Sequence, residues 1–260
     1  MHALLSTAVR CARSAGSVIL KHMDQLERLH VETKGKRDFV SEVDRMAEEK
    51  ITSHLATAYP DHGILAEESA PRGTDNEFVW IIDPLDGTTN FLHGYPEFAV
   101  SIAVARRGVL EHGVVYHPVA DELFTASRGQ GAQLNNRRIR CSKTSRMEMA
   151  LLGTGFQVKH LDTMDRWMKI FRATIPRTSG IRRSGSAALD LANLACGRLD
   201  GFWELSLNPW DIAAGALLIR EAGGLVSDFE GQQNFLDSGN IVAANPRLFN
   251  EFLQLIKARS

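Results

Sequence analysis

Cysteine is scarce in this chain, and its spacing argues against a disulfide-rich or zinc-bound protein. The 260 residues contain three cysteines, Cys11, Cys141 and Cys196, with no C-x-x-C pair among them. An odd, widely spaced set of this kind indicates reduced thiols rather than a disulfide framework. The nine histidines show no H-x-H or H-E-x-x-H spacing, so a zinc site is not expected either.

Long apolar runs and excess charge of one sign are also missing. No apolar run approaches the roughly 20 residues that a membrane-spanning helix needs. Arg10 and Arg13 interrupt the N-terminus too early for a signal peptide. The 30 Lys and Arg nearly balance the 31 Asp and Glu, and the net charge of −1 favours neither nucleic acid nor membrane. These absences predict a soluble, cytoplasmic, globular protein.

One segment departs from this even distribution of charge. Residues 128–146 contain six Lys or Arg and no Asp or Glu. A solvated hairpin face is the favoured interpretation of this basic segment. Steering of an anionic substrate, or a docking patch for an acidic partner or RNA, is the alternative.

Several catalytic motifs are absent as well. The chain has no G-x-x-x-x-G-K-[ST], no G-x-G-x-x-G and no G-x-S-x-G, and no cysteine is followed six residues later by arginine. Aspartyl-phosphate phosphatases use D-x-D-x-T, whereas Asp83 and Asp86 are one residue further apart. A covalent aspartyl intermediate is therefore the less favoured chemistry.

Hydrophobic periodicity predicts an α/β (α+β) protein in two halves. Helices are expected over 4–20 and 43–55, separated by a polar break at 34–38. A mostly antiparallel sheet is expected from strands at 63–66, 78–82, 98–105, 109–116, 123–126 and 132–134. Beyond a boundary near residue 140, strands are expected at 150–154, near 181, 199–204, 225–228 and 241–244, and helices at 162–174, 186–196, 211–222 and 247–256. The predicted halves are 1–140, an α+β half with most of the metal ligands, and 141–260, an α/β half with a mixed sheet.

Two aspartates end the apolar strand at 78–82. Asp83 and Asp86 flank Pro84 and Leu85, and turn chemistry alone explains much of this pattern. A buried strand ending in two carboxylates needs a neutralising cation, however, because two buried like charges repel. The Leu85 carbonyl adds a third oxygen between them, and such oxygens are what Mg²⁺ prefers. We therefore expect a magnesium site here.

Other acids are expected to complete this site. Glu67 and Glu68 end the strand at 63–66, and alternation along a strand allows only one of them to face the site. Asp211 precedes the helix at 212–222, where an N-cap role and a metal-ligand role are about equally favoured. Together the acids suffice for two Mg²⁺ ions that share Asp83 and clamp a phosphate between them.

Hydroxyl groups follow the two aspartates directly. Thr88 and Thr89 come after Gly87, and a helix starting there would offer free N–H groups to a phosphate, unless the residues serve only as a cap. Thr88 is also placed to hydrogen-bond an attacking water, with Asp44 as its partner and proton acceptor.

Three segments resemble the signatures of the inositol monophosphatase family. They are Glu67-Glu68-Ser69, the stretch from Trp80 to Phe91, and Trp210-Asp211-Ile212-Ala213-Ala214-Gly215, with Glu-Ala-Gly-Gly at 221–224 in its usual place. Their order and spacing match over essentially the whole chain. The stretches 98–104, 122–134 and 185–190 look closest to a bacterial branch of that family.

The resemblance implies a five-layer αβαβα sandwich, usually dimeric, which uses two or three Mg²⁺ ions and is inhibited by Li⁺. The first ion would be held by Glu67, Asp83 and the Leu85 carbonyl, and the second by Asp83, Asp86 and Asp211. The catalytic residues implied are Asp44, Thr88 and Glu67. The substrate-binding residues implied are Glu67, Asp86, Gly87, Thr88, Arg182, Gly185, Ser186, Ala187, Glu204 and Asp211.

The function implied is hydrolysis of myo-inositol 1-phosphate by a metal-activated water. One alternative keeps the fold and changes the ester to fructose 1,6-bisphosphate or 3′-phosphoadenosine 5′-phosphate. Another is a binding role, because the bacterial branch is associated with transcription antitermination, with NusA and RNA polymerase as implied partners. The basic segment is the sequence feature to which that role could be attached.

Overall fold

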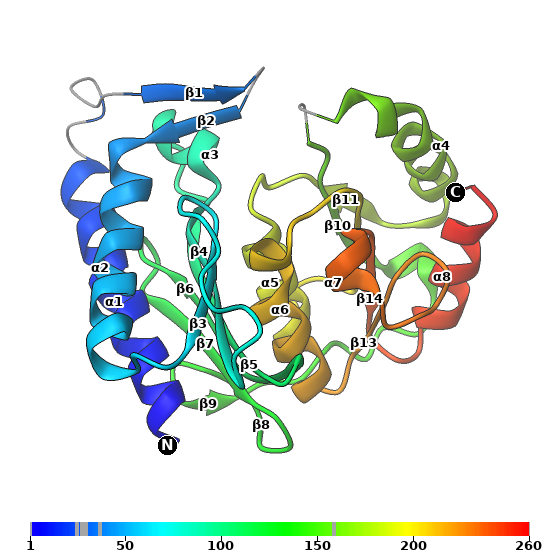
Figure 1. The fold of residues 1–260 in the computed structure, drawn as a ribbon. Helices are drawn as coiled ribbons and strands as arrows, with labels where there is room; N and C mark the ends of the chain where they lie inside the picture. The colour runs from blue at the N-terminus through cyan, green and yellow to red at the C-terminus, as the bar shows by residue number, and fades with distance from the viewer. Residues whose placement is uncertain (1, 24–25, 27–30, 36–37, 158–159, 260) are drawn as a thin grey trace.

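Five layers of secondary structure, in the order α–β–α–β–α, make up the molecule (Figure 1). The computed structural model describes residues 2–23, 26, 31–35, 38–157 and 160–259. The helices of the three α layers, in order, are α1 (Ala3–Met23) with α2 (Glu42–Ala58), α5 (Ala187–Ala195) with α6 (Pro209–Glu221), and α4 (Met164–Thr174) with α8 (Phe249–Lys257). The predicted five-layer sandwich is therefore confirmed.

The larger sheet has seven strands in simple chain order, β3 to β9. Only β3 and β4 run parallel, and every other neighbouring pair is antiparallel. The strands are β3 (Gly63–Ala66), β4 (Phe78–Asp86), β5 (Ala99–Arg106), β6 (Val109–His117), β7 (Glu122–Ser127), β8 (Gly131–Leu134) and β9 (Arg137–Arg138). The ends of the neighbouring strands β3 and β4 lie at one edge of this sheet.

The smaller sheet is mixed and follows the order β11-β10-β12-β14-β13. Its strand β10 runs parallel to β11 and β12, whereas β14 runs antiparallel to β12 and β13. The strands are β10 (Leu151–Thr154), β11 (Gly180–Arg182), β12 (Gly201–Glu204), β13 (Leu225–Ser227) and β14 (Ile241–Ala244). The division of the chain at residue 140 stays a prediction.

Short elements account for most differences from the expected structure. The polar break expected at 34–38 falls in a hairpin of β1 (Val31–Gly35) and β2 (Asp38–Ser41), and residues 36–37 of that break lie outside the described residues. Polar side chains weaken the period-2 pattern that identifies a strand. The other short elements are α3 (Thr88–Leu92), α7 (Phe235–Ser238) and the 3₁₀ turns Met147–Met149, Leu161–Thr163 and Ile175–Arg177.

Helix α6 is the centre of the middle layer and is buried nearly all round. Every residue from Asp211 to Ile219 is buried, as expected for a helix packed between two sheets. Two glycines allow this close packing. A Cβ on Gly215 would lie 2.5 Å from the Leu191 Cβ of α5, and one on Gly113 of β6 would lie 3.0 Å from the Ala214 carbonyl oxygen. Burial on both sides fixes the N-terminus of α6 between the sheets.

Candidate active site

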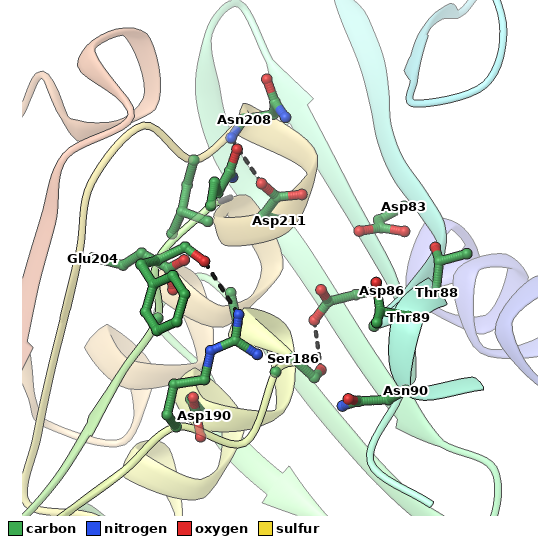
Figure 2. Close-up of a pocket in the computed structure, with 18 of the residues that line it drawn as sticks. Asp83, Asp86, Thr88, Thr89, Asn90, Ser186, Asp190, Glu204, Asn208 and Asp211 are labelled. Atoms are coloured by element: carbon green, nitrogen blue, oxygen red, sulfur yellow. Dashed lines mark hydrogen bonds between the residues drawn. The ribbon is translucent and has the colours of Figure 1, made fainter. Parts of the chain in front are cut away.

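A pocket of about 270 Å³ opens where β3, β4, α3, α5 and α6 meet (Figure 2). Its walls come from both sheets and the helix layer between them. The lining residues are Glu67, Asp83, Leu85, Asp86, Gly87, Thr88, Thr89, Asn90, Thr154, Gly155, Phe156, Gln157, Arg183, Gly185, Ser186, Ala187, Asp190, Glu204, Leu207, Asn208 and Asp211. Most of the predicted site residues are therefore brought together in one place.

Strand β4 ends in a bulge rather than in the expected turn. Asp83 pairs with Ser101 and Asp86 with Ala99 on β5, so one extra residue is inserted between the two aspartates. The Leu85 N–H donates to Asp83 Oδ1 at 2.9 Å and closes the bulge locally. A bulge re-aims side chains at a strand end, and here it leaves Asp83, Leu85 and Asp86 all lining one pocket.

Asp83 is the most buried of the clustered acids, with 1% of its surface exposed. Burial raises its pKa well above the ordinary value, and the carboxylates of Glu67, Asp86 and Asp211 raise it further. The four acids are thus electrostatically coupled in a low-dielectric site. Among the described residues, no three acidic, histidine or cysteine side chains are already arranged closely enough to ligate one ion. The metal-ligand set stays a prediction.

Asp86 joins the two halves of the pocket. Its Oδ2 accepts hydrogen bonds from the Ser186 hydroxyl at 2.5 Å and from the Ala188 N–H at 2.7 Å (Figure 2). Burial raises the pKa of the Asp86 carboxyl to about 6, and the hydrogen bond from Ser186 opposes this rise. One carboxylate oxygen therefore engages the start of α5.

Thr88 and Asp44 are hydrogen-bonded to each other. The Thr88 hydroxyl donates to Asp44 Oδ1 at 2.8 Å and lies 3.2 Å from the Leu85 carbonyl oxygen. Asp44 is buried in the first turn of α2 and does not itself line the pocket. Gly87 precedes α3 with a φ of 94°, and a Cβ there would meet the Glu97 carbonyl oxygen at 2.9 Å, so the turn requires glycine. Asp44 can thus act on the pocket through Thr88.

Only one of the two adjacent glutamates at the end of β3 lines the pocket, as strand alternation predicted. That residue is Glu67, which follows β3 directly. The N–H of Glu68 donates to Glu48 Oε2 of α2 at 2.8 Å. Glu48 is buried, and it anchors the turn that carries Glu67.

Asp211 is not the N-cap of its helix, which corrects the expected start of α6. The helix begins two residues earlier, at Pro209, with Asn208 as the N-cap. Asp211 occupies the third helical position, and its Oδ2 accepts from the Asn208 N–H at 2.8 Å in a capping box (Figure 2). The helix start therefore fixes the orientation of a carboxylate that also lines the pocket.

The arginine in the pocket is Arg183, not the predicted Arg182. Arg182 is on β11, is exposed and donates to its neighbour's carbonyl at Ile181. Arg183 lies 4.6 Å over the Phe156 ring and donates to the Phe156 carbonyl oxygen at 3.1 Å. Adjacent side chains at a strand end point to opposite sides, so the two arginines cannot both face the pocket.

Two buried acids form the wall opposite Asp83. Glu204 ends β12, and burial raises its pKa well above the ordinary value, with the Asp190 and Asp211 carboxylates adding to the rise. Asp190 was not predicted, although a lone acid in the apolar helix stretch of 187–195 is a signal that could have identified it. Burial raises its pKa to about 8, and the Ser184 hydroxyl donates to it at 2.8 Å.

Charge in the pocket is strongly one-sided. Over the described residues, its lining contains six carboxyl side chains and one arginine, and no lysine or histidine. The remaining donors and acceptors are carbonyl, hydroxyl and amide groups. Hard oxygen ligands of this kind suit Mg²⁺ and give no soft sulfur or imidazole ligand for zinc.

Comparisons with known proteins identify the family of the chain. The sequence model of the inositol monophosphatase family matches residues 1–259. "Nus factor SuhB" of Pseudomonas aeruginosa is 51% identical over 262 residues, covering 99% of this chain and 97% of that protein. Within the described residues, no helix is long and apolar enough to cross a membrane.

Two solved structures show the same fold over nearly the full length. The extragenic suppressor protein SuhB of Bartonella henselae superposes with a TM-score of 0.95 at 45% identity, covering 98% of this chain and 99% of that chain. An inositol monophosphatase from Anabaena gives a TM-score of 0.89 at 39% identity, covering 99% and 96%. The resemblance to the family, and to its bacterial SuhB branch, is thereby confirmed. The chain belongs to the inositol monophosphatase family.

Proposed function

We propose that the protein is a Mg²⁺-dependent phosphomonoesterase that hydrolyses myo-inositol 1-phosphate to myo-inositol and phosphate. The observation that carries this proposal is the charge of the pocket, six carboxyl groups against Arg183 among the described lining residues. A phosphate ester is itself an anion and would be repelled by such a lining. Cations bound by the same acids would reverse the sign of the field, which makes a metal an essential part of the site.

Glu67, Asp83, Asp86, Asp211 and the Leu85 carbonyl are the residues that would hold the ions. When bound, two or three Mg²⁺ ions would neutralise these acids, polarise the phosphate and lower the pKa of a water molecule. Inhibition by Li⁺ and a homodimeric state belong to the same proposal, since both are expected of the family. The three cysteines of the chain are free thiols, which supports the proposed cytoplasmic location.

In the proposed mechanism the Thr88 hydroxyl orients the attacking water. Because this hydroxyl donates to Asp44 Oδ1 at 2.8 Å, its oxygen lone pairs face away from that carboxylate and can accept a hydrogen bond from water. A proton leaving the water passes to the Thr88 oxygen while the Thr88 proton passes to Asp44. The water oxygen then bonds to phosphorus and the ester P–O bond breaks. The inositol oxygen takes a proton from solvent water and leaves as the alcohol, and Asp44 returns its proton to solvent.

The opposite wall suits a polyol leaving group. Glu204 and Asp190 are buried carboxyl groups that can exchange hydrogen bonds with hydroxyls. Gly185, Ser186 and Ala187 supply backbone and hydroxyl groups at the start of α5. A second phosphate, as in fructose 1,6-bisphosphate or 3′-phosphoadenosine 5′-phosphate, would face the same acids, with Arg183 as the one basic side chain among the described lining residues. This favours a monophosphate.

Phosphate release from a panel of esters, with and without Mg²⁺ and Li⁺, tests this function. We expect myo-inositol 1-phosphate to be hydrolysed only with Mg²⁺ present, and the Asp83→Asn variant to be inactive. Equal turnover by wild type and Asp83→Asn would show that the acids do not bind the catalytic cation. Faster turnover of the two bisphosphate substrates would favour the alternative ester.

We also propose a role in transcription antitermination, because a relative with 51% identity is named a Nus factor. The basic segment 128–146 is a candidate surface for NusA or RNA polymerase, since Arg137 and Arg138 on β9 are exposed. A pull-down of RNA polymerase and NusA with wild type and Asp83→Asn separates the two roles. Retention of both partners by the inactive variant is the expected result. Loss of binding together with activity would contradict an independent surface.

A further inference from the structure

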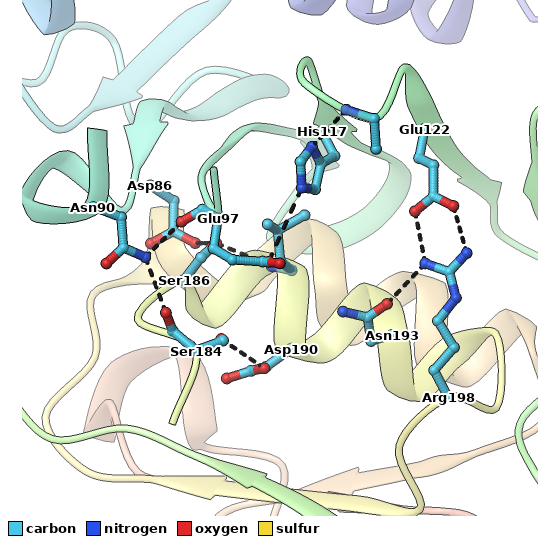
Figure 3. A network of polar contacts seen from close by, with 12 residues as sticks. Asp86, Asn90, Glu97, His117, Glu122, Ser184, Ser186, Asp190, Asn193 and Arg198 are labelled. Atoms are coloured by element: carbon cyan, nitrogen blue, oxygen red, sulfur yellow. Dashed lines mark hydrogen bonds and ion pairs between the residues drawn. The ribbon is translucent and has the colours of Figure 1, made fainter. Parts of the chain in front are cut away.

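Asn90 lies in α3 and links the segment that follows this helix to a loop from the other half of the chain. Its Nδ2 donates to the Glu97 carbonyl oxygen at 2.6 Å and to the Ser184 carbonyl oxygen at 2.9 Å (Figure 3). The second contact joins residues 94 positions apart in the sequence. Both amide hydrogens of Asn90 are therefore engaged by backbone carbonyls, so this side chain donates no further hydrogen bond to a ligand.

The loop that Asn90 contacts forms part of the pocket wall. Gly185 follows Ser184 with a φ of 92°, and a Cβ there would lie 2.8 Å from Asn90 Nδ2 and 3.0 Å from its Oδ1. The loop backbone is thus pressed against the amide. Ser186 comes next and caps α5 by accepting from the Leu189 N–H. Asn90 consequently holds Ser184 and Gly185 in position at the pocket wall.

A second contact holds the same loop but differs in chemistry. The Ser186 hydroxyl donates to Asp86 (Figure 2), which is one of the proposed metal ligands. Disturbing that contact would alter the metal site and the loop together. Asn90 is uncharged and holds the loop through the Ser184 carbonyl, so replacing it moves this part of the pocket wall without replacing a proposed metal ligand.

We propose that Asn90 is a specificity-determining positioning residue, which fixes the loop at Ser184 and Gly185 against α3 and so determines how tightly the leaving group of the substrate is held. The inference rests on the proposed function and deepens it. In this proposal Asn90 acts on the alcohol part of the ester indirectly, by positioning the loop, and is not itself a metal ligand. A group held about 1 Å out of place can cost up to about a hundredfold in rate.

The test compares Asn90→Ala with wild type using two ligands. We expect the KM for myo-inositol 1-phosphate to rise about tenfold, because the loop at Ser184 and Gly185, which borders the alcohol part of the substrate, is displaced. Inorganic phosphate, used as a competitive inhibitor, should keep its inhibition constant within about twofold. Phosphate lacks the alcohol part of the ester and is expected to bind beside Asp83 and Thr88, away from the loop that Asn90 holds. Binding of Mg²⁺ measured by calorimetry should likewise be unchanged.

A matched control is available in Asn245. Its Nδ2 also donates to two groups of a distant segment, Ser142 Oγ at 2.8 Å and the Thr144 carbonyl oxygen at 3.1 Å, but it does not line the pocket. Asn245→Ala should lower the melting temperature and leave KM unchanged. This variant shows how the loss of an amide outside the pocket changes the melting temperature and KM.

Three outcomes would overturn the inference. They are an unchanged KM in Asn90→Ala, an equal rise in KM and in the phosphate inhibition constant, or a KM rise of the same size in Asn245→Ala. Asn90→Ser, which is too short to span both carbonyls, replaces Asn90→Ala if that variant does not fold. Absence of inositol phosphate hydrolysis by wild type would count against the proposed function and would be seen before any variant is made.

Discussion

The two walls of the pocket carry similar acids but hold them in different ways. The N-terminal wall comprises Glu67, Asp83, Leu85, Asp86 and Thr88 and is built on the ends of β3 and β4 and the start of α3. Hydrogen bonds fix Asp83, Asp86 and Thr88 there. The C-terminal wall, which comprises Arg183, Ser186, Asp190 and Glu204, places its two acids in the apolar elements α5 and β12. The first arrangement suits binding of cations, and the second suits exchange of hydrogen bonds with neutral hydroxyls.

The largest effect should come from the pair that connects α2 to the N-terminal wall. Replacing Thr88 by Ala or Asp44 by Asn should lower kcat by about a thousandfold, because the attacking water loses its proton acceptor. KM should change little, since Thr88→Ala keeps the backbone N–H through which Thr88 is expected to contact the phosphate. Steady-state phosphate release checks this, with Thr57→Ala on the exposed face of α2 as the control. A KM effect without a kcat effect would make Thr88 a binding residue instead.

The next effect tests the C-terminal wall. Glu204→Ala should lower kcat/KM for myo-inositol 1-phosphate by roughly thirtyfold, because a hydroxyl partner is lost. A Cβ on Gly155 would lie 2.1 Å from Glu204 Oε2, so Gly155→Ala should displace the same carboxylate and reproduce the loss. Phenyl phosphate, which has no alcohol hydroxyls, should be hydrolysed by both variants at close to the wild-type rate. Equal losses on both esters would remove the distinction between the walls.

The same difference explains how much of the site could be predicted from the sequence. Asp83, Leu85 and Asp86 are adjacent in the chain and follow an apolar strand, so a local pattern is sufficient to identify them. Arg183 precedes α5 and Asp190 lies within it, so both reach the pocket only because the two halves of the chain pack together. A lone acid in an apolar stretch marks Asp190 as unusual, but no local pattern records which pocket it faces. The fold class and most element positions follow from periodicity, whereas the β4 bulge does not, because its Pro84 suggests a turn with equal force.

A smaller effect is expected one layer behind the N-terminal wall. Glu48 holds the turn that carries Glu67 by accepting from the Glu68 N–H. Glu48→Ala should raise the Mg²⁺ concentration for half-maximal activity by about tenfold, as found for groups that orient metal ligands. Glu48→Gln keeps an acceptor oxygen and should therefore raise this Mg²⁺ concentration by less. The adjacent exposed Glu49→Ala serves as the control, and an unchanged Mg²⁺ requirement in Glu48→Ala would contradict the role.

The smallest effect is on stability and concerns Asp190 in the C-terminal wall. Its folded pKa is raised from 3.8 to about 8, chiefly by burial. A carboxyl with a raised folded pKa contributes stability that is complete below its unfolded value and is lost as the pH rises through the folded value. In Mg²⁺-free buffer, Asp190→Asn should therefore leave the melting temperature nearly unchanged at pH 4 and raise it by at least roughly 5 °C above pH 8, because the loss of stability builds up between the unfolded and the folded pKa. Differential scanning calorimetry at the two pH values measures this. A gain of the same size at both would mean that the buried carboxyl is already ionised at pH 4, and that the C-terminal wall holds charge as the N-terminal wall does.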